Sequence, residues 1–170
     1  LDADAVAGAG QAFSVNFFGG TITYANDTFT EATALDGSIG NTLSLTLSGD
    51  TFATVGVLTG SGTHYTASNV PAGLTAVVTT TSTTTATVAL TGTAAAHTNA
   101  ADITNLGITF TNAAFTGGSA STVTNFAKTD ITVDFGDAAI VYAGGFSETG
   151  GNAGAVTGSI TATLTGDTWN

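Results

Sequence analysis

Apolar and polar residues alternate along many short segments of this chain. A period of two puts apolar side chains on one face and Ser, Thr, Asn or Asp on the other, which is typical of half-buried β-strands. The segments with this pattern are 13–17, 43–47, 106–110, 131–135 and 160–164. Gly, Asn and Asp pairs that suit tight turns separate them. The pattern predicts an all-β sandwich, with one short helix or loop around 94–102.

The chain also contains an internal repeat. FSVNFFGGTITY (13–24) aligns with ITVDFGDAAIVY (131–142), so that Val15, Phe17, Ile22 and Tyr24 match residues 118 positions later. After a slip of one residue, 29–52 aligns with 146–169 at an offset of 117. The identities in this second block are Phe29/Phe146, Glu31/Glu148, Gly37/Gly154, Thr46/Thr163, Leu47/Leu164, Gly49/Gly166, Asp50/Asp167 and Thr51/Thr168. A constant register over 24 residues favours duplication over chance similarity.

This repeat predicts the domain organisation. We expect an N-terminal extension, 1–12, as a candidate donor strand, and a single β-sandwich domain, 13–170. Within this domain 13–52 and 131–169 are similar to each other, and 53–130 is a unique middle part. The second copy begins a repeat that the chain does not complete, so a terminal strand is left over for a neighbouring molecule. Apolar residues suited to strand exchange stand near both ends, and either end could donate: Phe13, Val15, Phe17, Ile160, Leu164 and Trp169.

One stretch resembles a known class of proteins. VPAGLTAVVTTTSTTTATVALTGTAAAHTNAADITNLGITFTNAAFTGG (70–118), followed by ITVDF at 131, is similar to the β-strand repeats of large bacterial cell-surface and extracellular proteins. The resemblance covers about 40–147 and implies immunoglobulin-like or related sandwich modules, such as a jelly roll, with an extended terminal strand, and it implies no catalytic residue. This chain is short for the class, which suggests that separate subunits build the array.

Charge and composition restrict the partners. The net charge is −11, Lys128 is the single cation and arginine is absent, so we expect no binding to nucleic acid or to anionic membranes. No apolar run approaches the roughly 18 residues of a membrane span, so we expect no membrane insertion. Cysteine is absent as well. The first residue is Leu1 rather than Met, which favours a processed, secreted protein at the cell surface.

Candidate chemistry is sparse. His64 and His97 have no metal-ligand neighbour at short spacing, and Asp134 with Asp137 lacks the aromatic surroundings expected of a glycosidase pair, so we expect no enzyme. Asp134 and Asp137 lie at a strand end, where their carboxylates are candidate ligands for a calcium ion. Lys128 is expected in a surface ion pair rather than in a crosslink. Asn26 begins an Asn-Asp-Thr glycosylation pattern.

Together these features predict a structural subunit of an extracellular filament or pilus, a homopolymer that grows head to tail by β-strand donation. The alternative is a non-polymerising adhesin or surface-layer module that binds glycan or calcium. Such a module would remain a monomer with a site on its loops.

Overall fold

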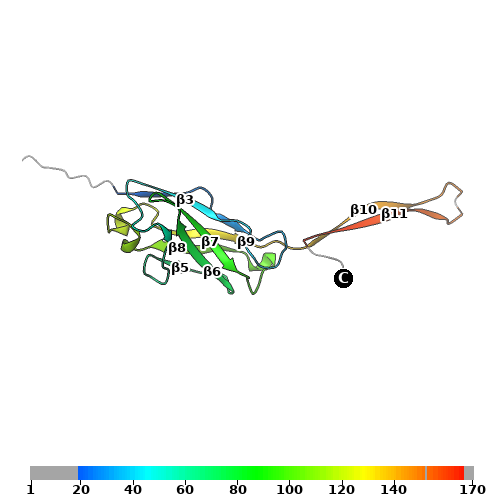
Figure 1. Ribbon diagram of the computed structural model, residues 1–170. Helices are drawn as coiled ribbons and strands as arrows, with labels where there is room; N and C mark the ends of the chain where they lie inside the picture. Colours follow the sequence, from blue (N-terminus) through cyan, green and yellow to red (C-terminus); the bar gives the residue numbers. More distant parts are fainter. Residues whose placement is uncertain (1–18, 152, 167–170) are drawn as a thin grey trace, which may run out of the picture.

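The computed structural model describes residues 19–151 and 153–166, and it confirms the all-β sandwich. Two sheets face each other (Figure 1). In spatial order, the five-stranded sheet contains β1 (Thr21–Tyr24), β3 (Leu43–Ser48), β7 (Thr85–Gly92), β6 (Leu74–Thr80) and β4 (Gly56–Val57). The four-stranded sheet contains β2 (Thr28–Thr30), β9 (Ala127–Asp134), β8 (Ile103–Phe110) and β5 (Tyr65–Ser68).

The core lies between the two sheets and follows the alternation of the sequence. Along β3 every second side chain is buried, beginning with Leu43, and the outward-facing Ser and Thr are exposed. Phe29, Phe110 and Phe135 are the largest fully buried side chains. Phe52, Phe110 and Phe115 form an aromatic cluster with ring centroids 5.8 to 6.1 Å apart. One contiguous core therefore holds the sandwich together.

A third sheet lies outside this sandwich. β10 (Ala139–Glu148) and β11 (Val156–Thr165) form a two-stranded antiparallel hairpin that extends away from the body (Figure 1). Of the described residues, those in the core cluster lie between Ile22 and Phe135, and none belongs to the hairpin. The expected single sandwich over 13–170 thus differs from the structure of the described residues, in which the hairpin forms a sheet of its own outside the two facing sheets.

Short 3-10 helices are the only helical segments among the described residues, at Asn99–Ala101, Asn112–Ala114 and Ala120–Thr122. The first of them falls within the predicted helix-or-loop region, 94–102. In the described part of the chain, no helix has the length and apolar character needed to cross a membrane.

The repeat offers a matched pair of substitutions. Phe29 and Phe146 occupy equivalent positions, but Phe29 is fully buried and Phe146 is 64% exposed. We expect Phe29→Ala to lower the free energy of unfolding by about 3–5 kcal/mol, and Phe146→Ala to change it by less than about 0.5 kcal/mol. Urea denaturation of the monomer measures both values. Similar losses in the two variants would contradict the separation of hairpin and core.

Candidate assembly site

The hairpin repeats a ladder that is already present in the sandwich. In the sandwich, Ile22 pairs with Leu47 and Tyr24 with Leu45. In the hairpin, Ile140 pairs with Leu164 and Tyr142 with Ala162. Each hairpin residue stands 118 (β10) or 117 (β11) positions after its counterpart, so the register of β10 on β11 reproduces that of β1 on β3. The duplicated sequence therefore forms the same local pairing twice.

The correspondence continues to the tip of the hairpin. In the sandwich, Glu31 bridges to Ile39, and the amide of Ala32 donates to the carbonyl of Ser38. At the equivalent places in the hairpin, Glu148 pairs with Val156, and the amide of Thr149 donates to the carbonyl of Ala155. Even a side-chain bond recurs, since Gly37 N–H donates to Glu31 Oε1 at 2.6 Å and Gly154 N–H donates to Glu148 Oε1 at 2.7 Å.

The two copies differ in what covers them. One face of the hairpin carries most of its large apolar side chains, and the opposite face carries mainly Thr and Ser, together with Val141. The equivalents of the apolar face in the sandwich, Ile22, Phe29 and Leu43, are fully buried. In the hairpin, Ile140 is 46% exposed, Phe146 64% and Ile160 47%. The hairpin therefore presents to solvent the face that the sandwich uses to build its core.

Glu31 in the first copy has polar partners that its counterpart in the second copy, Glu148, does not have among the described residues. The Glu31 side chain is 1% exposed, and Oε1 lies 3.1 Å from His97 Nδ1. Oε2 accepts the amide of Gly136 at 2.9 Å. Glu148 is exposed, and within the described residues its hydrogen bond is the one from Gly154. Its second carboxylate oxygen is thus open to a further donor.

Strand β9 supplies most of the surroundings of β2. The two strands pair in parallel, with Phe29 opposite Val133, and the amide of Glu31 donates to the carbonyl of Asp134 at 2.9 Å. Ile131, Val133 and Phe135 are fully buried on the face that packs into the core. Because β10 pairs with β11 on one side only, its other edge corresponds to the edge of β2 that β9 occupies.

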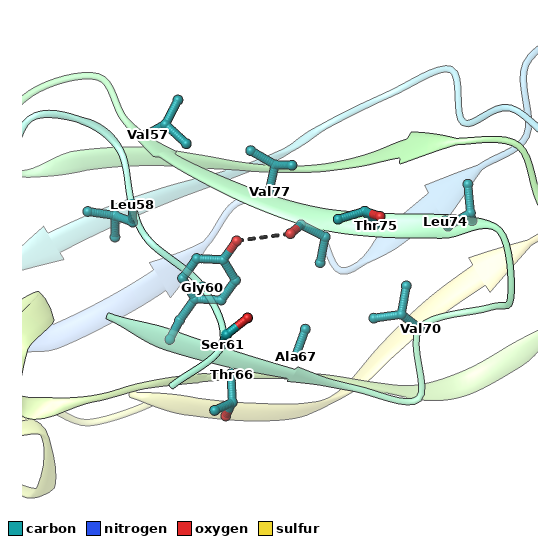
Figure 2. A pocket seen from close by; sticks show the side chains of 12 residues that line it. Val57, Leu58, Gly60, Ser61, Thr66, Ala67, Val70, Leu74, Thr75 and Val77 are labelled. Carbon is teal, nitrogen blue, oxygen red and sulfur yellow. Dashed lines mark hydrogen bonds between the residues drawn. The ribbon is translucent and has the colours of Figure 1, made fainter. Parts of the chain in front are cut away.

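A second gap lies between β5, the edge strand of the four-stranded sheet, and the part of β6 that extends beyond the two-residue strand β4. The sheets leave a slot of about 570 Å³ there, lined by apolar side chains that include Leu58, Ala67, Val70 and Leu74 (Figure 2). The Tyr65 hydroxyl crosses it and donates to the carbonyl of Ala76 at 2.9 Å, and it accepts the amide of Val78 at 3.4 Å. One phenol thus takes the place that the backbone of an additional strand would occupy beside β6.

The residues predicted for strand exchange fall into two groups. Ile160 and Leu164 lie on the apolar face of the hairpin, where Ile160 is exposed and Leu164 is partly buried. The predicted half-burial of the 160–164 strand is not reached at Ile160, because no described residue covers that face. Phe13, Val15, Phe17 and Trp169 lie outside the described residues, as does the extension 1–12.

Sequence reasoning missed three residues of these edges. Phe146 and Glu148 were visible as identities in the repeat but were not recognised as an exposed counterpart of Phe29 and Glu31. No sequence pattern indicated the role of Tyr65, because its partners Ala76 and Val78 belong to β6, in the other sheet.

The calcium and glycosylation candidates are surface residues. Asp134 and Asp137 are exposed, and Asp137 Oδ1 accepts the amide of Asn99 at 3.1 Å. The described residues contain no group of three or more His, Asp or Glu side chains arranged to hold a metal ion. Asn26 is exposed. Calcium binding and glycosylation stay predictions.

The single lysine lies in an ion pair on the edge of the sandwich. Lys128 Nζ is 2.7 Å from Asp130 Oδ1 and 5.6 Å from the ring centre of Tyr24. The hydrogen bond and charge of Lys128 lower the pKa of the Asp130 carboxyl. Burial, together with the negative charge of Asp130, raises the pKa of Tyr24. These contacts account for Lys128 as a structural residue.

Comparison with known proteins adds no relative: no protein-family model matches the chain, and no curated protein or solved structure shows significant similarity to it. The resemblance to extracellular β-strand repeats therefore stays a prediction.

The slot yields a stability prediction. Tyr65→Phe keeps the ring but leaves the carbonyl of Ala76 and the amide of Val78 without the hydroxyl. We expect the free energy of unfolding to fall by about 1–2 kcal/mol. Urea denaturation provides the value. Tyr142→Phe, at an exposed tyrosine of the hairpin, is the matched control and should leave the stability unchanged; an equal effect of both variants would contradict a bridging role.

Proposed function

We propose that this protein is a structural subunit of an extracellular filament that grows head to tail by β-strand addition between copies. The observation that carries the proposal is the hairpin, which presents an uncovered copy of the β1–β3 face. A two-stranded ribbon with one apolar face is marginally stable by itself and gains from a further strand or sheet. The paired strands and open edge make the hairpin an acceptor for an extended segment.

The energetic gain is sufficient for a lasting joint. Ile140, Phe146 and Ile160 are about half exposed. Covering them would contribute about 1–2 kcal/mol each, because complete burial of such a side chain is worth about 1.5–3 kcal/mol. Ladder hydrogen bonds and the other apolar side chains add to this, and the loss of freedom on association offsets part of it.

The arrangement of the ends supports a linear polymer. The start of the described chain, the blue segment that leads into β1, lies at the end of the sandwich remote from the hairpin (Figure 1). A contact between the hairpin of one copy and the opposite end of the next joins two different surfaces. Such a heterologous contact repeats along a line unless its rotation closes a ring.

The surface composition fits an extracellular setting. Charged residues make up 8% of the chain, and Thr, Ser, Asn and Gly supply most of the polar surface. The absence of cysteine is compatible with assembly by non-covalent contacts alone. Localisation outside the cell rests on these features and on the resemblance of 70–118 to surface-protein repeats.

Removal of the apolar face tests the proposal. The double variant Phe146→Thr/Ile160→Thr places β-branched threonine, which suits a strand, at both positions and removes two exposed apolar side chains. We expect it to form no filaments, whereas the unaltered chain forms filaments visible by negative-stain electron microscopy and pelleted by ultracentrifugation. The melting temperature of the sandwich should stay within about 2 °C, because neither residue belongs to the core.

The matched control is Val141→Thr, which alters an exposed apolar residue on the opposite face of β10. This variant should assemble as the unaltered chain does. If the unaltered chain stays monomeric at every concentration, the non-polymerising surface module becomes the better explanation. Filaments from the double variant would show that the apolar face is not the joint.

A further inference from the structure

The repeat identifies the segment that can cover the hairpin. Residues 13–18 correspond to 131–136, since Val15 and Phe17 align with Val133 and Phe135, and Phe13 aligns with Ile131. In the sandwich, 131–134 is the end of β9; its apolar residues Ile131 and Val133 are fully buried, and so is Phe135 directly after it. The chain thus carries a second β9-like sequence ahead of β1, and a second set of β1-, β2- and β3-like sequences after β9.

We infer that residues 13–18 of a second copy pair in parallel with residues 145–148 of β10, as β9 pairs with β2. This inference rests on the proposed filament. The register follows from the sandwich, where Thr28, Phe29 and Thr30 pair with Thr132, Val133 and Asp134. Translated through the repeat, Ser14 lies opposite Gly145, Val15 opposite Phe146, and Asn16 opposite Ser147. The apolar side chains of the donor then lie on the same face as Phe146.

Glu148 fixes this register from the acceptor side. The amide of Glu31 donates to the carbonyl of Asp134, and the amide of Gly136 donates to Glu31 Oε2. The equivalent bonds in the joint run from the amide of Glu148 to the carbonyl of Asn16 and from the amide of Phe18 to the carboxylate of Glu148. The carboxylate already holds its internal bond from Gly154, as Glu31 holds Gly37, so the acceptor is preorganised.

The donor must come from another molecule. The chain's own β9 is occupied on both sides, by β2 in parallel and by β8 in antiparallel pairing. Residues 13–18 directly precede the described chain, whose blue first segment lies at the end of the sandwich remote from the hairpin (Figure 1). A second copy can place its own 13–18 along β10 without disturbing either sandwich.

Disulfide crosslinking tests the pairing residue by residue, because the chain has no natural cysteine. Val15→Cys and Phe146→Cys are made in separate full-length chains, mixed, allowed to assemble and oxidised. Directly paired residues of adjacent strands have Cα separations that a disulfide can span, about 4.4–6.8 Å. We expect a crosslinked dimer of the two variants as the main product on non-reducing gels. Asn16→Cys with Ser147→Cys, one position along on the opposite face, should crosslink as well.

Mismatched pairs are the controls. Val15→Cys with Ser147→Cys joins residues that point to opposite faces and should give less than about one tenth of the product. Val15→Cys with Ala67→Cys reports insertion into the slot between β5 and β6 instead. A dominant crosslink to Ala67→Cys, or filaments without any crosslink to Phe146→Cys, would overturn the inferred pairing and leave the filament in place. If the unaltered chain forms no filaments, the proposed function and the pairing fail together.

A second measurement tests the carboxylate. Glu148→Gln removes the charge that would accept the amide of Phe18, and we expect the critical concentration for assembly to rise about tenfold or more. The control is Asp27→Asn, which removes one exposed charge outside the hairpin. Asp102→Asn would not serve as a control, because Asp102 accepts the amide of Phe135 in the sandwich. Equal critical concentrations for Glu148→Gln and Asp27→Asn would contradict the role of Glu148.

Discussion

The parallel contact between β2 and β9 fixes the chain in the four-stranded sheet after it has crossed over from the five-stranded sheet. The chain leaves the first sheet after β1, crosses through Ala25–Asp27, and enters the second sheet as β2. Pairing with β9 places Phe29 in the core and brings the buried carboxylate of Glu31 onto the amide of Gly136. A carboxylate that is out of water requires such donors, so the contact is both apolar and polar. With β2 held in this way, the paired strands β1 and β3 lie over the core in the other sheet.

The hairpin shows what the same sequence does without that contact. Its ladder, its turn and its Glu–Gly hydrogen bond form as they do in the sandwich, since all of them depend on neighbours within the repeat. Burial does not follow, because the covering strands lie elsewhere in the chain. Where Ala25–Asp27 turns between sheets, the second copy has Ala143–Gly144 and is one residue shorter. There β10 runs on as one strand, which joins the equivalents of β1 and β2.

Sequence patterns predicted the elements better than their partners. The alternation at 43–47, 106–110 and 131–135 marks β3, β8 and β9 because period-two burial is a local property. The repeat likewise identified the second copy, and with it Ile160 and Leu164. The slot could not be found in this way, since Tyr65 and Ala76 meet across the edges of two different sheets. Nor does alternation reveal whether a second sheet covers a strand, so the exposure of Phe146 required the structure.

Two β9-like sequences in one chain raise the question of which site each occupies. β9 spans eight residues and pairs along most of its length with β8, in addition to β2. A segment that displaced it would have to reproduce both ladders, but the match of 13–18 covers only the end of the strand. β9 is also tethered beside its partners, which gives it a high effective concentration there. The hairpin offers no such competitor among the described strands, because β10 has one open edge and β11 on the other. In the proposed filament the donor is therefore directed to the hairpin of a neighbour, and each addition would leave the new copy with its own hairpin uncovered.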